Sequence, residues 1–270
     1  MLVVVALASI AIWTNAAGRV ADRPAVVIGS ATPDPTIVVT PAPTARATPT
    51  SAPTLGPTPT PRPDPVRSPV DVNLAIHPES IFAHELTIVW CAPAGLQMVL
   101  AFLGHGNTSD ELQREIAARI PEWTTWDDNH VGGWGPTSIA RALAAYGATG
   151  YVERVFERRE DALRAAAVAL SATDSPVILL AWRGAHVWVM TGYRADADPR
   201  IFGDATISGT YILDPWYPRI SSIWGPSDPP GTFQDTAEMV RNFLPIRRPE
   251  GRYPTRDGRF IILVPTVTMD

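Results

Sequence analysis

Residues 90–100 read WCAPAGLQMVL and contain the only cysteine of this 270-residue chain. Pro93 suits the first turn of a helix, where its missing N–H has no partner to lose. Apolar residues then recur at helical spacing as far as Leu103, and the apolar run 86–90 before the cysteine predicts extended chain. The pattern therefore predicts that Cys91 lies at the N-terminus of a buried helix.

This position gives Cys91 two interpretations. The free N–H groups and the positive end of the helix dipole favour an anion there, so a thiol at this point loses its proton more easily. The thiolate is the reactive form of cysteine. A lone cysteine is also commonly a small buried hydrophobe, and the stretch alone does not separate the two interpretations.

The composition limits the class of protein. The net charge is −5, which argues against a nucleic-acid-binding surface because such a surface needs clustered Lys and Arg. One cysteine cannot form an internal disulfide bond. An unpaired cysteine in an exported protein suggests a residue that is either needed or buried.

The N-terminal segments predict export. Residues 1–30 contain an apolar run, 2–13, that suits a signal peptide or membrane anchor, although the basic residues usual before such a run are absent and a buried helix is the alternative. Residues 31–70 hold 12 of the 28 prolines among Thr, Ala and Ser, which predicts a disordered, extended stalk. The expected location is extracytoplasmic, with membrane contact only through the N-terminal segment.

Residues 71–270 are long enough for one domain with its own core. Helical patterns come first and strand patterns cluster later, which predicts an α+β fold with an N-terminal helical half packed on a C-terminal antiparallel sheet. After the Cys91 helix, the expected helices are 109–119 with Ser109 as N-cap and Pro121 beyond its end, 136–147, 159–171 and 235–243, and the expected strands are 151–156, 177–182, 186–193, 210–214 and 259–264.

A nucleophilic cysteine needs a base, and His186 is the best placed of the five histidines. It opens a strand whose alternating side chains fix one face toward the site. Asp214 ends the next apolar strand, which Pro215 stops. If the two strands pair, the carboxylate of Asp214 would come to the imidazole of His186. Taken singly, His186 also fits a satisfied core histidine and Asp214 a turn residue.

The three motifs together resemble a known family. The stretch WCAPA at 90–94, GAHVWVMTGY at 184–193 and ILDPW at 212–216 are similar to the peptidase domain that removes double-glycine leaders in bacteriocin exporters, called peptidase family thirty-nine. They are closer to its free-standing relatives in bacterial surface proteins. These domains belong to the papain-like cysteine peptidase superfamily, and the resemblance covers about residues 75–265.

The resemblance implies a catalytic triad. Cys91 would attack a carbonyl carbon, His186 would take up and return a proton, and Asp214 would orient the imidazolium. The backbone N–H of Cys91 would donate to the oxyanion. The implied partner is a peptide or protein substrate, and no cofactor or metal is expected.

One position departs from the superfamily. Six residues before the nucleophile, where a Gln supplies the second oxyanion donor, this chain has Glu85. An ionised carboxylate accepts hydrogen bonds but cannot donate one. Four explanations stay open: Glu85 is protonated in a dry site, His84 takes its place, the loop shifts by a residue, or the domain no longer cleaves anything.

Weaker signals concern the cleft and metals. Trp90, Trp188 and Trp216 flank the three proposed residues and are expected to wall a substrate cleft or simply to lie in the core. The aromatic, glycine-rich loop 123–134 would form a rim. It contains Asp127, Asp128 and His130, which fit a solvated turn better than a metal site because no paired histidine spacing accompanies the single cysteine.

These patterns favour a thiol-dependent peptidase or amide hydrolase. Two alternatives stay open: a catalytically inactive papain-like module that binds or adheres, and an acyl or amide transferase that uses the same Cys and His. Loss of the oxyanion donor would favour the first alternative, and a product formed with an added amine would favour the second.

Overall fold

The computed structural model describes residues 64–125, 134–247 and 255–266, all within the unit Pro61–Asp270. The predicted signal or anchor segment 1–30 and residues 31–63 of the predicted stalk lie outside the described residues, as do Asp127, Asp128 and His130. Among the described helices, none combines the length and the apolar character that crossing a membrane requires.

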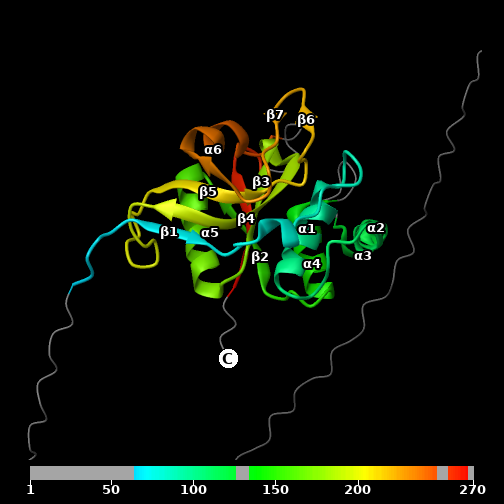
Figure 1. The fold of residues 1–270 in the computed structure, drawn as a ribbon, viewed down its shortest axis with the longest axis horizontal. Coiled ribbons are helices and arrows are strands. Elements are labelled where there is room, and N and C mark those ends of the chain that lie inside the picture. Colours follow the sequence, from blue (N-terminus) through cyan, green and yellow to red (C-terminus); the bar gives the residue numbers. More distant parts are fainter. Residues whose placement is uncertain (1–63, 126–133, 248–254, 267–270) are drawn as a thin grey trace, which may run out of the picture. The chain divides into compact units, whose positions relative to one another are not determined.

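One antiparallel sheet organises the domain (Figure 1). Its strand order is β2 (Tyr151–Phe156), β9 (Phe260–Pro265), β3 (Val177–Ala181), β4 (His186–Ala195), β5 (Ile207–Leu213) and β8 (Thr232–Asp235). A seventh strand, β1 (Val70–Asn73), pairs with the second half of β4. The long β4 is therefore the centre of the sheet, and its first residue is His186.

Helices cover both faces of the sheet. Figure 1 shows α1 to α4 on one side of it and α5 with α6 on the other. The helices are α1 (Cys91–Phe102), α2 (Asp110–Ala118), α3 (Ile120–Trp123), α4 (Pro136–Ala145), α5 (Arg159–Thr173) and α6 (Thr236–Asn242), with short 3₁₀ turns at Pro78–Ser80 and Trp182–Gly184.

The alternation along β4 separates two cores. Val187 and Val189 pack in the cluster with α1 and α4, whereas Trp188 and Met190 pack in the cluster with α5 and α6. This is what a pleated strand buried on both faces must do. The predicted α+β fold is confirmed, and the sheet carries helices on its second face as well as on the predicted one.

The extended run predicted at 86–90 is wrong. The N–H of Trp90 donates to the carbonyl of Thr87 at 3.2 Å, so the chain turns just before α1. Ile88 and Val89 in this run are exposed rather than buried in a strand. A short apolar run predicts burial only when a neighbouring strand is there to cover it, and none pairs with these residues in the described part of the chain.

The ends of α2 and four short strands show where local patterns succeed and where they fail. Ser109 caps α2 as predicted, because its hydroxyl accepts from the N–H of Leu112 at 3.3 Å. Pro121 lies in the first turn of α3, a helix that the sequence did not predict. Four strands were not predicted either: β1, β8, and the two strands of a hairpin, β6 (Ile220–Ser221) and β7 (Gly225–Pro226).

A glycine brings α1 close to the sheet. A Cβ atom on Gly95 would lie 2.5 Å from Cγ1 of Val187 on β4, which is too close for two carbon atoms. Gly95 lies one turn after Cys91, and Val187 directly follows His186, so the helix and the strand are in contact close to both site residues. This close approach sets the distance between the thiol and the imidazole.

We predict that Gly95→Ala destabilises the domain by about 1–2 kcal/mol, because overpacking outweighs the gain of about 1 kcal/mol in helix propensity. Urea unfolding of the purified chain would measure the change. Gly203→Ala is the control, since no atom lies within 4 Å of the added Cβ and the backbone there is not left-handed. Equal or greater stability of Gly95→Ala would contradict the close approach.

Candidate active site

The ends of three elements meet at the site: Cys91 opens α1, His186 opens β4, and Asp214 follows β5. β4 and β5 are paired, with Val189 opposite Leu213, so the aspartate comes to the imidazole as the strand order requires. Nε2 of His186 lies 2.7 Å from Oδ1 of Asp214. Both side chains are almost fully buried.

Aromatic rings enclose the imidazole. The ring of Trp182 stacks on that of His186 with centroids 4.0 Å apart, and Trp216 meets it edge-on at 6.3 Å. The backbone N–H of Trp216 also donates to Oδ1 of Asp214 at 2.9 Å. The histidine and the aspartate are therefore held in one orientation and shielded from water.

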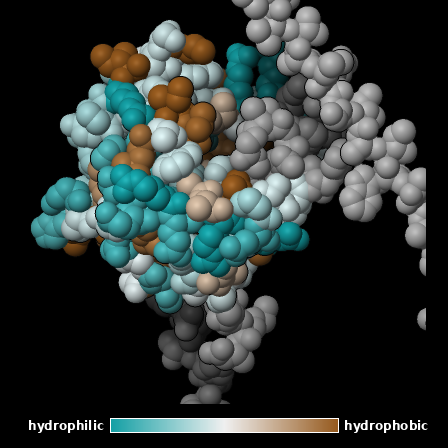
Figure 2. All heavy atoms as spheres, turned by 90° about the vertical axis from the view of Figure 1, so that its right-hand side faces the viewer, coloured by the Kyte–Doolittle hydropathy of each residue, from teal (hydrophilic) through white to brown (hydrophobic). Residues whose placement is uncertain are grey.

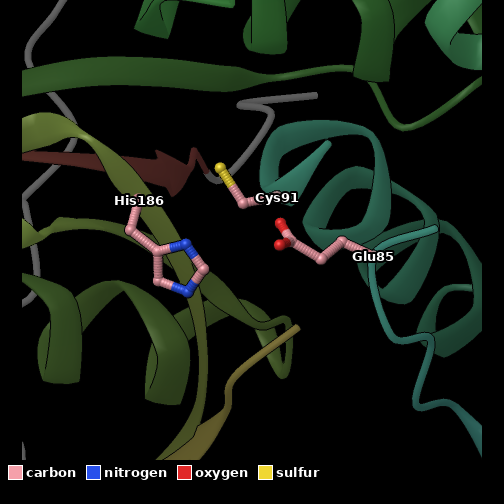
Figure 3. A group of neighbouring side chains, drawn as sticks. All are labelled: Glu85, Cys91 and His186. Atoms are coloured by element: carbon pink, nitrogen blue, oxygen red, sulfur yellow. The ribbon is translucent and has the colours of Figure 1, made fainter. Parts of the chain in front are cut away.

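The thiol of Cys91 lies near the ring nitrogen of His186 that Asp214 does not contact. Sγ of Cys91, a ring nitrogen of His186 and a carboxyl oxygen of Glu85 all lie within 4.8 Å of one another, and Sγ is 3.9 Å from the carbonyl oxygen of Ala185. Figure 3 shows the carboxyl group turned toward the imidazole, with Cys91 above it. Because Nε2 is engaged by Asp214, Nδ1 is the nitrogen that remains for Cys91.

The charges around His186 favour its protonated form. Burial lowers the pKa of His186, but the adjacent carboxylate of Asp214 and the neighbouring Cys91 outweigh burial and raise the pKa to about 10. At neutral pH the imidazole is therefore an imidazolium. A cation beside the sulfur stabilises a thiolate over a thiol.

Residues 74–234 match the Peptidase_C39 like family. The chain belongs to this family. A solved structure described as a double glycine motif protease from an AMS/PCAT transporter in complex with the leader peptide is similar to it, with 18% identity over 68% of this chain and 91% of that one and a TM-score of 0.34. No curated protein matches.

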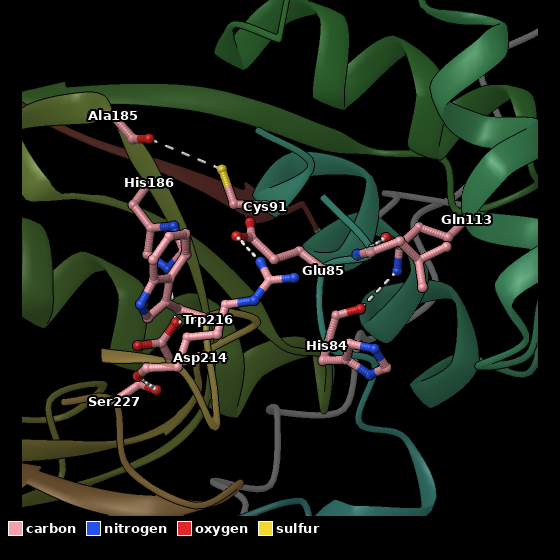
Figure 4. Close-up of polar contacts among 11 residues, drawn as sticks. His84, Glu85, Cys91, Gln113, Ala185, His186, Asp214, Trp216 and Ser227 are labelled. Carbon is pink, nitrogen blue, oxygen red and sulfur yellow. Dashed lines mark hydrogen bonds and ion pairs between the residues drawn. The ribbon is translucent and has the colours of Figure 1, made fainter. Parts of the chain in front are cut away.

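In this Peptidase_C39 like domain, Glu85 is the residue six positions before Cys91, where the family resemblance implied a glutamine. Its side chain is 1% exposed, and Oε1 accepts from Nη1 of Arg219 at 3.0 Å. Oε2 is buried and has no hydrogen-bond partner among the described residues. Figure 4 shows the carboxyl group of Glu85 beside Cys91.

Burial raises the pKa of Glu85 to about 7, and His186 and Arg219 only partly offset it. Glu85 therefore changes charge near neutral pH, whereas an exposed glutamate is ionised there.

Two of the explanations offered for Glu85 are excluded by its surroundings. His84 is exposed, and Figure 4 shows its imidazole turned away from Cys91. The loop has not moved by a residue either, because Glu85 itself reaches the site and its N–H donates to the carbonyl of Pro215 at 2.9 Å. Protonation of Glu85 and loss of catalysis are the two that remain.

A buried pair of amides holds the segment that carries Glu85. Gln113 accepts from the N–H of Leu86 at 2.8 Å and donates to the carbonyl of His84 at 2.9 Å and to Oε1 of Gln97 at 3.0 Å. Gln97 in turn donates to the carbonyls of Asn107 and Ser109. Both amides are buried and hydrogen-bonded, so they fix this segment against α1 and α2.

The three tryptophans predicted to line a cleft lie in different surroundings. Trp216 contacts His186 as described, and Trp90 is partly exposed beside Cys91. Trp188 is 3% exposed and packs in the core with α5 and α6, so its assignment to a cleft wall is corrected. Its strand position puts it on the same face as His186, but two residues further into the sheet.

Sequence reasoning missed Trp182, Arg219 and Gln113. Trp182 lies four residues before His186, and an aromatic residue so close to the predicted base was a usable signal. Arg219 and Gln113 reach Glu85 and its neighbours from 134 and 27 residues away along the chain. No local pattern marks contacts at such separations.

Glu85, Cys91 and His186 are also of the kinds that bind metals, and their ligand atoms are close enough for one ion after a small movement. One observation opposes this use. With the pKa of His186 raised to about 10, the imidazole keeps a proton on Nδ1 at neutral pH and has no free lone pair there. The arrangement fits a proton-transfer site better than a metal site.

We predict that Glu85→Gln changes stability in a pH-dependent way. The folded-state pKa lies above the unfolded value, so the folded chain holds an extra proton between about pH 4.5 and 7 and loses this stabilisation as the pH rises through about 7. The wild type loses free energy of unfolding over this range, whereas Glu85→Gln does not. The variant's free energy of unfolding should therefore rise relative to that of the wild type by as much as about 3 kcal/mol between pH 4.5 and pH 8.

Urea unfolding at both pH values would measure this gain. Glu111→Gln, at an exposed glutamate on α2, is the matched control and should show none. A difference between Glu85→Gln and the wild type that stays constant with pH would mean that Glu85 titrates normally.

Proposed function

We propose that this chain is a thiol-dependent peptidase that uses Cys91, His186 and Asp214. The observation that carries the proposal is the 2.7 Å contact between Nε2 of His186 and Asp214, which leaves Nδ1 facing the thiol. This is the arrangement of a nucleophile, its base and the group that orients the base.

The proposed reaction begins with a thiolate at Cys91. Sγ attacks the carbonyl carbon of a peptide bond, and the imidazolium of His186 gives its Nδ1 proton to the departing amine. Water then attacks the acyl-thioester, with His186 now accepting a proton, and releases the acid. Asp214 supports the imidazolium throughout by accepting from Nε2–H.

The start of α1 supplies one oxyanion donor. Cys91 is the first residue of the helix, so its backbone N–H makes no intrahelical hydrogen bond. An N–H at this position and the positive end of the helix dipole both favour a developing negative charge. Glu85 stands where the second donor would be.

We further propose a peptide as substrate. The solved structure named above is described with a leader peptide. In this chain, exposed apolar residues lie near the site residues in the sequence: Ile88 and Val89 before Cys91, and Ile220 and Ile223 after Asp214. In Figure 2, hydrophobic side chains gather at the upper part of the face, the level at which Figure 1 has β6 and β7. Such side chains suit an extended peptide with apolar residues near the cleaved bond.

The location is also a proposal. The apolar run at residues 2–13 and the proline-rich segment 31–70 support an extracytoplasmic domain carried on a stalk. Membrane contact would be confined to the N-terminal segment.

The alternative is a binding module that has lost catalysis, and an ionised Glu85 facing the oxyanion position favours it. Alkylation separates the two. We predict that iodoacetamide labels Cys91 at pH 6 at least about tenfold faster in the wild type than in His186→Ala, because the thiolate is the reactive form of cysteine and a neighbouring imidazolium favours an anion.

Intact-mass spectrometry of the full chain would follow the labelling, and Cys91→Ala would show that no other residue reacts. Asp214→Asn should give an intermediate rate, since the imidazolium loses its carboxylate but keeps a hydrogen-bond acceptor. Equal, slow rates in the wild type and His186→Ala would leave Cys91 as a packing residue and the domain as a binding module.

A further inference from the structure

Glu85 is fixed from three directions. Its N–H is bound by the carbonyl of Pro215, its neighbours on both sides are bound by Gln113, and Oε1 is bound by Arg219. These contacts leave Oε2 buried, without a partner among the described residues, and close to Cys91 and His186 (Figures 3 and 4). An unpartnered buried oxygen held so firmly costs stability, which makes it a candidate for function.

Peptide cleavage at Cys91 forms a tetrahedral intermediate with a negative oxygen. The backbone N–H of Cys91 can donate to that oxygen from one side, and Oε2 of Glu85 lies where a second donor is needed. As a carboxylate, Oε2 would repel the oxyanion. As a carboxylic acid, it would donate an O–H hydrogen bond to an anion, which is a strong type of bond.

We propose that Glu85 acts as a protonated carboxylic acid whose Oε2–H stabilises the oxyanion, and that ionisation of Glu85 switches the site off as the pH rises. This inference rests on the proposed peptidase function and adds its regulation. The site would then work in acidic surroundings and be restrained in alkaline ones.

Four charged or titratable groups face Glu85. Arg219, from the loop after β5, and the imidazolium of His186, from β4, favour the ionised form. Burial opposes it most, and Asp214, which follows β5, opposes it as well. Cys91, at the start of α1, is the fourth group and lies within 4.8 Å of the carboxyl group. The balance puts the pKa of Glu85 at about 7. The carboxyl group is therefore mostly protonated below pH 7, and its protonated fraction falls about tenfold for each pH unit above it.

Arg219 is the positioning residue for this switch. Because Arg219 donates to Oε1, the proton of the carboxylic acid is directed to Oε2. The positive charge of Arg219 also lowers the pKa of Glu85, and so lowers the pH at which Glu85 ionises. Arg219→Met should therefore raise the pH at which the site turns off, which a merely structural loss would not do.

The test compares two reagents that react with the same sulfur in the full chain. p-Nitrophenyl acetate forms an S–acetyl bond and releases p-nitrophenolate through a tetrahedral oxyanion. Iodoacetamide forms an S–CH₂ bond and releases iodide with no oxyanion. Both need the thiolate, so the ratio of the acylation rate to the alkylation rate cancels its population and reports on the oxyanion donors alone.

In the wild type, we expect this ratio to be constant below about pH 7 and to fall about tenfold per unit above it, by no more than the hundredfold to thousandfold that one donor contributes. Glu85→Gln should give a high ratio that does not change with pH, because an amide donates at any pH. Glu111→Gln should follow the wild type, and Arg219→Met should decline at a higher pH.

A wild-type ratio that stays constant, or a decline in Glu85→Gln like that of the wild type, would overturn the role of Glu85. Arg219→Met gives an independent answer if Glu85→Gln does not fold, because an unmoved decline would also overturn it. Slow alkylation that His186→Ala does not change would instead refute the peptidase function, and this inference with it.

Discussion

The buried contact between His186 and Asp214 sets the chemistry of the whole site. A carboxylate 2.7 Å from the imidazole keeps a proton on a ring that burial alone would leave neutral. The resulting imidazolium lies beside Cys91 and draws the pKa of Glu85 downward. Removing the aspartate would therefore change the protonation of His186 and, through it, that of Glu85.

The fold supplies this contact through elements that have structural roles of their own. β4 is at once the centre of the sheet, the strand that presents His186 and the surface on which α1 packs through Gly95. The distance between the thiol and the imidazole thus depends on core packing, which is stiff. The segment with Glu85 is held differently, by the polar contacts of Gln113 and Arg219, so its position depends on a few hydrogen bonds.

Local patterns were enough to predict much of this. The helix after Cys91, the cap at Ser109 and the strand from His186 follow from spacing and residue type, and the order of the strands brought Asp214 to the imidazole as predicted. β1, β8 and the β6–β7 hairpin were missed because each strand has only two to four residues. β1 does alternate, as VDVN, but over too short a stretch to separate it from the proline-rich segment before it. The apolar run before Cys91 gave the opposite error: it predicted extended chain, but the run forms a turn and its Ile88 and Val89 lie at the surface.

The state of Glu85 could not be predicted from sequence at all. Its identity was visible, but its partner Arg219 is 134 residues away, and its pKa depends on burial that only the folded chain defines. The position of Trp182 near His186 was visible in the sequence, but its stacking on the imidazole depends on a tight left-handed turn at Arg183 that only the folded chain shows. Contacts of this kind decide how the site works, even where motifs decide which residues form it.

The most direct test of the account is the protonation state of His186, measured by nitrogen NMR on the full chain with labelled histidine. The five histidines can be told apart by substituting each in turn. We predict that His186 carries protons on both ring nitrogens at pH 7 and titrates near pH 10. A ring that loses a proton near pH 6.5, as a free imidazole does, would show that the ion pair with the thiolate does not form.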